Sequence, residues 1–212
     1  MSKVSFLLRY KGRQFVFVFT TTAKILFDKL FAFLFFAIIG WWLFPIIAIL
    51  VKLDSKGPVY YKQERWGVNN QPIICYKFRT MQVNKSEDDF EQTTRNDPRV
   101  TSLGKILRKF SLDELPQFIN VLKGDMAIIG PRPERPVFVE QIAASIPLYQ
   151  TRHVIKPGLT GWAQVNYPYG TNLEDSLMKL RYDLYYIKHR SLFLDVNIVV
   201  KTMSTVLFFR GQ

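Results

Sequence analysis

Cysteine and histidine are nearly missing from this sequence. Cys75 is the only cysteine among 212 residues, so no disulfide can form within the chain. His153 and His189 are the only histidines, and with one thiol they cannot assemble the usual nitrogen and sulfur sites for zinc. Any bound metal must therefore be held by oxygen ligands.

Acidic residues are also scarce, since 17 Asp and Glu stand against 29 Lys and Arg, a net charge of +12. This excess indicates an anionic partner: nucleic acid, an acidic membrane surface or a phosphate-bearing substrate. The sequence has no Walker loop, no Gly-x-Gly-x-x-Gly, Gly-x-Ser-x-Gly or His-Glu-x-x-His motif and no internal repeat. Its length fits one domain with an appendage and excludes a large multidomain machine.

Charge is absent altogether from Leu30 to Val51, the run LFAFLFFAIIGWWLFPIIAILV. A membrane helix needs ~20 apolar residues, and this run lies too far from the start to be a cleavable signal. Pro45 removes a backbone donor inside it, and Gly40 loosens the same region. Basic residues flank the run on both sides, so the positive-inside rule places both flanks in the cytoplasm.

We therefore predict a re-entrant helix that breaks near Pro45 and leaves the membrane by the face it entered. A straight spanning helix is the alternative. Residues 1–52 would form an N-terminal membrane-association segment. Residues 53–212 would form a small cytosolic domain.

The two ends of the chain combine basic, aromatic and apolar residues. Residues 1–24 suit anionic headgroups, or a disordered basic tail. Near the other end, Leu192, Val196, Val199 and Met203 recur at helical spacing. Such a stripe is more often core packing than a membrane contact, but the residues at 208–210, Phe-Phe-Arg, favour the interface.

Residues 53–190 have the composition of a mixed globular domain. Strands are predicted at residues 58–63 and 73–78, joined in a hairpin by a Gly-Val-Asn-Asn turn. Helices are predicted at residues 102–109, 114–122, 137–146 and 173–188. The expected fold class is α+β and mostly helical, with a short β-hairpin and interfacial amphipathic helices.

Two acids, Asp113 and Glu114, stand side by side in the stretch RKFSLDELPQ. A capping box with Ser111 as N-cap would give them a purely structural role. Pro116 weakens that interpretation, because it would remove a hydrogen bond from the same helix, and a helix that begins near Leu115 tolerates it better.

In either frame Asp113 lies at the positive end of a helix, next to basic residues, and is expected to stay ionised. An ionised carboxylate among cations can act as a nucleophile toward phosphorus when the substrate's charge is neutralised. Glu114 is a natural ligand for Mg²⁺, which prefers carboxylate and phosphate oxygens.

Three stretches carry a resemblance to a known family: YKFRTM at 76–81, LRKFSLDELPQFINVLKGDMAIIGPRPERP at 107–136 and KPGLTGWAQVNYPYG at 156–170. From Lys24 onward the sequence resembles the bacterial sugar transferases, the monotopic phosphoglycosyl transferases that prime glycoconjugate synthesis. The ending is similar to members that start exopolysaccharide assembly.

The resemblance implies transfer of a sugar 1-phosphate from a UDP-sugar to undecaprenyl phosphate, with release of UMP. It implies Asp113 as the nucleophile that forms a phosphosugar-enzyme intermediate and Glu114 as a catalytic ligand of Mg²⁺. It also implies a re-entrant helix at the cytoplasmic face of the bacterial inner membrane. This chain has Phe44-Pro45 where some members have Ser-Pro, so the details of its break differ.

Basic residues and one further acid complete the expected site. Lys77 and Arg79 alternate on a strand, so one face could present both to a diphosphate, with a solvated strand face as the alternative. Prolines on both sides of Arg132 suit a phosphate clamp, or a rigid surface turn. Further candidates for substrate binding, each with an ordinary structural alternative, are Arg108, Arg152 and Asp183.

Other functions are compatible with parts of the sequence. A basic membrane-tethered module could bind nucleic acid, but no nucleic-acid motif is present, so none is expected as a partner. A non-catalytic scaffold of a polysaccharide assembly complex would lack the acidic pair, which this chain has. A hydrolase would use water in place of the lipid. The sugar is not identified by the sequence, a homodimer is compatible with it, and the chain is expected to be a minimal catalytic version.

Overall fold

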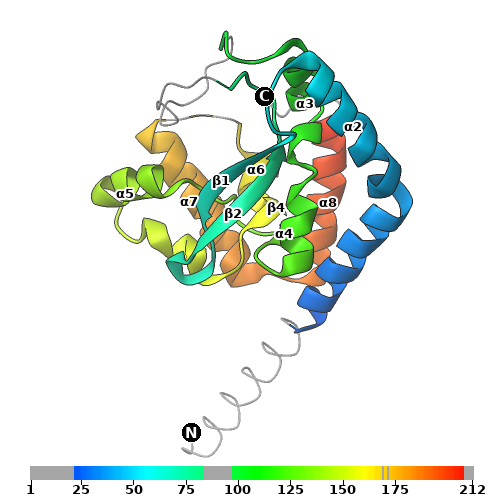
Figure 1. The fold of residues 1–212 in the computed structure, drawn as a ribbon. Helices are drawn as coiled ribbons and strands as arrows, with labels where there is room; N and C mark the ends of the chain where they lie inside the picture. The colour runs from blue at the N-terminus through cyan, green and yellow to red at the C-terminus, as the bar shows by residue number, and fades with distance from the viewer. Residues whose placement is uncertain (1–21, 84–96, 169, 171, 208–212) are drawn as a thin grey trace, which may run out of the picture.

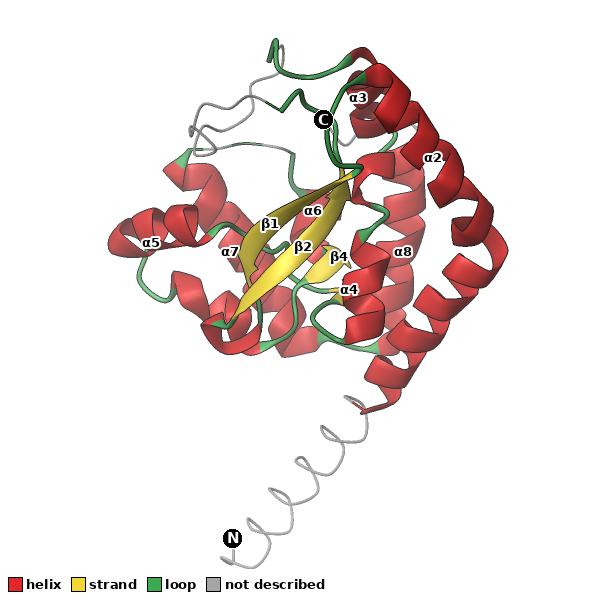
Figure 2. Cartoon of the chain, viewed as in Figure 1, coloured by secondary structure: helices red, strands yellow, loops and turns green. Residues whose placement is uncertain are grey.

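The computed structural model describes residues 22–83, 97–168, 170 and 172–207. One long bent helix lies along a body of shorter helices and two small sheets (Figure 1). The secondary structure is mostly helical, as the α+β prediction required (Figure 2). The predictions for residues 1–21 and 208–210 lie outside the described residues.

The apolar run forms a helix that extends from Thr22 to Asp54. It bends around η1, a π-helical turn at Phe36–Gly40, and continues as α2, Trp41–Asp54 (Figure 1). A Cβ at Gly40 would lie 2.5 Å from the Phe36 ring, so any larger residue in this turn would have to displace that ring. The helix does not break at Pro45, which lies inside α2. The irregular turn comes before the proline, at a π-helical turn of the kind that commonly kinks a helix.

Both halves of this helix pack against the same body. In the first half, Ala32 is fully buried in the central core, and Phe35 stacks on Phe118 with ring centroids 4.0 Å apart. The start of the helix is tied to the body by Lys24, whose Nζ donates to Asp195 Oδ2 at 3.0 Å. In the second half, Phe44, Ile47 and Val51 are buried with Phe78 and Leu107.

The remaining surface of the helix is apolar and exposed. By length and composition this is the one helix of the described residues that could cross a membrane. In water such a surface is costly, at about 25 cal/mol for each Å² of apolar area. Its exposed members include Leu26, Phe27, Leu30, Phe33, Ile38, Trp41, Ile46, Ile49 and Leu53.

The predicted hairpin is confirmed. Strand β1, Tyr60–Trp66, pairs antiparallel with β2, Pro72–Phe78. The turn η2, Val68–Asn70, contains two asparagines at positive φ, a conformation that asparagine tolerates. The register pairs Gln63 with Cys75 and Tyr61 with Lys77. Because side chains alternate along a strand, Gln63, Arg65, Cys75 and Lys77 lie on one face of the hairpin.

A second sheet, which the sequence did not predict, joins β3, Ala127–Ile129, in parallel to β4, Gly158–Thr160. Its strands are too short to show a period. Gly130 and Gly158 allow the close approach, because a Cβ on Gly158 would lie 2.1 Å from the backbone nitrogen of Gly130. The sheet lies in the central core, with Ile128 and Ile129 among its buried members.

The helices of the body follow the predictions closely. The predicted helix at residues 102–109 is observed with the same bounds. Helix α5, Pro136–Ser145, begins and ends one residue earlier than predicted, and α7, Leu173–His189, ends one residue later. The helix after the acidic pair begins later than expected, with Pro116 as its N-cap. The helices are α3, Ser102–Lys109; α4, Gln117–Lys123; α5, Pro136–Ser145; α6, Trp162–Asn166; α7, Leu173–His189; and α8, Leu192–Leu207.

Helix α8 bears out core packing for only one side of the helix. Ile198 is fully buried in the central core. On the opposite side, Leu192, Phe193, Val196 and Val200 are exposed. The helix therefore packs one face on the body and leaves a second apolar face uncovered.

Arg79 is placed differently from the expectation that it shares a strand face with Lys77. Strand β2 ends at Phe78, and the Arg79 side chain turns to the end of α2. Its guanidinium donates to the carbonyls of Val51 and Ser55, the latter at 2.7 Å, and to that of Lys56. Arg79 therefore binds carbonyls at and just beyond the end of a helix, where side chains commonly supply donors.

We predict that Arg79→Lys lowers the free energy of unfolding by about 2 kcal/mol, because an ammonium group cannot reach the same set of carbonyls. The thermal midpoint of the purified protein should fall accordingly. Arg181→Lys, at an exposed position of α7, is the control and should shift stability by about 0.5 kcal/mol or less. An unchanged midpoint for Arg79→Lys would contradict the assigned role.

Candidate active site

The acidic pair lies in η3, Leu112–Glu114, a single 3₁₀ turn between α3 and α4. The capping box is not formed: Ser111 has a positive φ of 55° and makes no side-chain cap bond. The Glu114 carboxylate instead points to cations on other elements. The structural interpretation of the pair through capping is therefore wrong.

Glu114 is held by two cations from different parts of the chain. Lys77 Nζ lies 2.6 Å from Glu114 Oε1. Arg132 binds both oxygens, with Nη2 at 2.6 Å from Oε1 and Nη1 at 3.1 Å from Oε2. Burial alone would raise the pKa of Glu114, but Arg132 and Lys77 together hold it well below the usual value.

Asp113 has the opposite surroundings. Its side chain is 9% exposed and makes no hydrogen bond to another described residue. Burial and the neighbouring charge of Glu114 raise the pKa of Asp113 to about 6, although Lys77, Arg108 and Arg132 oppose the shift. The sequence predicts that the helix end and the basic neighbours dominate the pKa of Asp113, but burial outweighs their effect. At neutral pH Asp113 is still mostly ionised, and no donor from the described part of the chain binds its oxygens.

The other predicted residues separate into two groups. Lys77, Arg108 and Arg132 bring positive charge near Asp113, and Arg108 is fixed there by a 2.8 Å bond from Nε to Thr80 Oγ1. Arg152 and Asp183 lie behind the site and are almost fully buried. Arg79 belongs to neither group.

Arg152 and Asp183 form an internal ion pair, with Nη2 2.8 Å from Oδ2. Burial raises the pKa of Asp183 to about 6 in spite of this partner. Burial would lower the pKa of Arg152, but the Asp183 carboxylate keeps it above the usual value. Both side chains are at most 3% exposed, so the pair supports the site from the interior.

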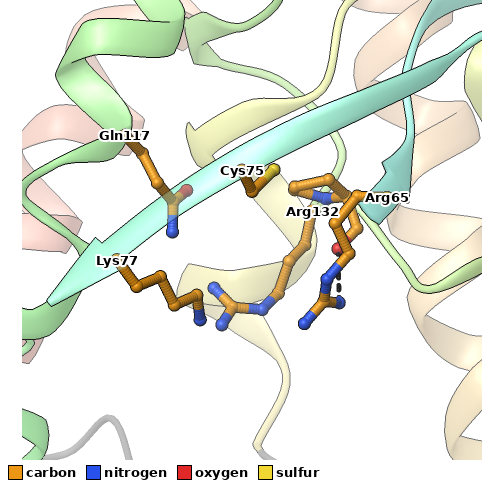
Figure 3. A pocket seen from close by; sticks show the side chains of 6 residues that line it. Arg65, Cys75, Lys77, Gln117 and Arg132 are labelled. Atoms are coloured by element: carbon orange, nitrogen blue, oxygen red, sulfur yellow. Dashed lines mark hydrogen bonds between the residues drawn. The ribbon is translucent and has the colours of Figure 1, made fainter. Parts of the chain in front are cut away.

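Two residues at the site were not predicted, Arg65 and Gln117. Figure 3 shows them around a pocket in which the side chains of Lys77, Gln117 and Arg132 converge. Gln117 is 4% exposed and makes no hydrogen bond to another described residue through its amide. Alternation along the hairpin, continued from Lys77 through the register, was the signal that could have found Arg65.

The donor set fits magnesium in kind. Asp113 and Glu114 supply carboxylate oxygens, which Mg²⁺ takes one or two at a time together with substrate phosphates. The described residues contain no cluster of three or more His, Cys, Asp or Glu. Both oxygens of Glu114 are bound by Lys77 and Arg132, so a metal on Glu114 requires these cations to move toward phosphate.

Comparison with known proteins gives the class. The family model described as bacterial sugar transferase matches residues 19–209. The chain belongs to the bacterial sugar transferase family.

Several relatives have assigned activities. The chain is 49% identical over 160 residues to a UDP-N-acetylgalactosamine-undecaprenyl-phosphate N-acetylgalactosaminephosphotransferase of Aeromonas hydrophila, covering 76% of this chain and 38% of the relative. It is 48% identical over 159 residues to a UDP-glucose:undecaprenyl-phosphate glucose-1-phosphate transferase of Escherichia coli K12, covering 74% and 34%. Thus it spans less than half of these two relatives. An exopolysaccharide production protein of Rhizobium leguminosarum is 39% identical over 170 residues, covering 76% of this chain and 84% of the relative.

His153, next to the buried Arg152, is a buried packing residue whose pKa is shifted. It is 4% exposed, and its Nδ1 faces Asn70 Oδ1. Burial, aided by the charge of Arg152, lowers its pKa from 6.5 to about 4. The folded protein therefore keeps the ring neutral where the unfolded chain takes up a proton.

This difference predicts a loss of stability as the pH falls from about 6.5 to about 4, worth roughly 3 kcal/mol in full. In His153→Gln this component should be absent, so the variant's thermal midpoint should depend less on pH than that of the wild type across this window. His189→Gln removes an exposed histidine and serves as the control. Parallel pH curves for wild type and His153→Gln would contradict the prediction.

Proposed function

We propose that this protein transfers a sugar 1-phosphate from a UDP-sugar to undecaprenyl phosphate and releases UMP, as the first step of glycoconjugate or exopolysaccharide synthesis. The named activities of its relatives support the reaction class. The observation that carries the mechanism is the contrast within the acidic pair: a buried carboxylate with no hydrogen bond from the described residues lies beside one that is fully paired.

Asp113 performs the first step as a nucleophile. One carboxylate oxygen attacks the phosphorus nearest the sugar, the bond from that phosphorus to the bridging oxygen breaks, and the electron pair leaves with UMP. A phosphate oxygen of the lipid then attacks the same phosphorus, and Asp113 departs as a carboxylate. Neither step requires proton transfer, because the attacking and leaving groups are ionised oxyanions.

The surrounding cations make this attack by one anion on another feasible. Lys77 and Arg132 line the pocket beside the pair, where they can neutralise a diphosphate. Arg65 lines the same pocket and donates to the turn that carries Arg132. Gln117 adds an amide that can donate to a phosphate or sugar oxygen. Arg108 contributes charge from the side of α3.

Magnesium belongs to this proposal as a cofactor. Glu114, with Asp113 beside it, would hold the ion, and when bound it supplies charge neutralisation at the diphosphate. Lys77 and Arg132 keep Glu114 ionised and oriented until that exchange takes place.

The bent apolar helix supports a re-entrant placement in the membrane. Lys24, near its start, is paired with Asp195, and the carbonyl of Val51, near its end, accepts from Arg79, so both ends are tied to one body. A straight spanning helix would carry these ends to opposite faces of the membrane. With its apolar outer surface in lipid and basic residues at both ends, we place the body on the cytoplasmic face of the bacterial inner membrane.

The exposed apolar face of α8, with Phe193 and Val196, fits the same membrane surface. The lipid acceptor would then reach Asp113 from the membrane, which favours transfer over hydrolysis. The proposal also includes assembly of two copies of this chain as a homodimer. The sugar is open, since the named relatives differ in it.

We predict that Asp113→Asn abolishes UMP release, by a factor of about 10³ or more, because the amide is not a nucleophile toward phosphorus. The assay uses detergent-purified protein with a panel of UDP-sugars, Mg²⁺ and undecaprenyl phosphate. Glu64→Gln, on the exposed face of β1, is the matched control and should retain activity. Full activity in Asp113→Asn would refute its role as the nucleophile.

Topology gives a separate prediction. Cysteines introduced as Thr22→Cys and Lys56→Cys, one at each end of the apolar helix, should both react with a membrane-impermeant maleimide in inverted membrane vesicles and neither in spheroplasts. The wild type is the blank, since its single cysteine, Cys75, is buried. Labelling of one variant in spheroplasts and the other in inverted vesicles would establish a spanning helix.

A further inference from the structure

Four successive backbone carbonyls hold the turn that carries Arg132, and each accepts from a different partner. Gly158 N donates to Pro131 O at 2.9 Å, and Trp66 N donates to Glu134 O at 3.0 Å. The two carbonyls between them accept from arginine side chains. We propose that these arginines, Arg65 and Arg152, are positioning residues that act on the reaction through Arg132.

Arg65 binds the turn from the hairpin. Its Nη1 donates to Pro133 O at 3.0 Å. The other edge of the guanidinium is fixed by Gln63, with Nε 2.9 Å from Oε1. The side chain is 14% exposed, and burial lowers its pKa. The partly buried guanidinium of Arg65 is therefore held by two neutral groups, the Pro133 carbonyl and the Gln63 amide. The Glu134 carboxylate lies 3.7 Å away.

Arg152 binds the turn from behind. Its Nη2 donates to Arg132 O at 3.1 Å, and Nη1 donates to the Tyr149 hydroxyl at 2.7 Å. The Asp183 carboxylate, 2.8 Å away, anchors this arginine to α7. The ion pair thus connects the interior of the body to the backbone of the catalytic turn.

The sequence of the turn explains why it needs such partners. Pro131 and Pro133 have no N–H, so these residues cannot close the turn with bonds of their own. Their carbonyls still need donors, which Gly158 N and Arg65 supply. With the backbone held at four points, Arg132 can reach both oxygens of Glu114 although its side chain is 40% exposed.

The consequence is that Arg65 and Arg152, the latter held by Asp183, set the position of Arg132 without touching substrate. Lysine cannot replace either arginine, because an ammonium lacks the planar set of donors that meets a carbonyl and a second partner together. This inference rests on the proposed function, since it assumes that Arg132 binds the nucleotide diphosphate once that ligand is present.

A double-mutant cycle with UDP as the probe tests the inference. Binding of UDP in the presence of Mg²⁺ is measured by calorimetry for the wild type, Arg65→Gln, Arg132→Gln and the double variant. Arg65→Gln should weaken binding about tenfold in the wild-type background and less than about twofold in the Arg132→Gln background. Asp183→Asn should show the same pattern, from the opposite side of the turn.

Several outcomes would overturn the assignment. Equal losses in both backgrounds would mean that Arg65 binds UDP directly or acts only on the stability of the fold. No loss in either would mean that the turn does not need it. Arg181→Gln, which removes an exposed arginine, is the control and should have no effect. If the folded wild type binds no UDP, the proposed function fails together with the inference; if it binds and the losses multiply, the inference alone fails.

Discussion

The contact of Glu114 with Lys77 and Arg132 is the interaction on which the site depends. It joins η3, the hairpin and the 131–134 turn at a single carboxylate. Its strength comes from opposite charges in a partly buried place, with a bidentate guanidinium that also sets direction. Burial and the charge of the ionised Glu114 raise the pKa of Asp113, whose side chain has no hydrogen-bonding partner among the described residues. The same three elements thus create one restrained and one available carboxylate.

The apolar helix and the body form a single structural unit. Aromatic stacking at Phe35 and Phe118 connects the first half of the helix to α4, the helix that follows the acidic pair. Arg79 connects the second half to the end of the strand that carries Lys77. The acidic pair is therefore fixed relative to the apolar surface, which matches a reaction between a water-soluble nucleotide sugar and a lipid.

Local chemistry explains what the sequence could predict. Period and turn residues located the hairpin and the longer helices, and the acidic pair was found because it stands among basic residues. Long-range contacts could not be predicted from the sequence, because they depend on tertiary packing. Examples are the parallel pairing of β3 with β4, the turn of Arg79 toward α2 and the pairing of Arg152 with Asp183. Pro45 was identified as a disturbance, but the bend lies at η1, a π-helical turn that the sequence pattern does not mark.

The most direct test of the central claim is intact-protein and peptide mass spectrometry after mixing the purified enzyme with UDP-sugar and Mg²⁺ in the absence of lipid. The account predicts an added mass of one sugar phosphate on the peptide that contains Asp113, and loss of that adduct when undecaprenyl phosphate is added. Two results would contradict it. One is product formation with no adduct detected in samples taken within a single catalytic cycle. The other is an adduct on another residue.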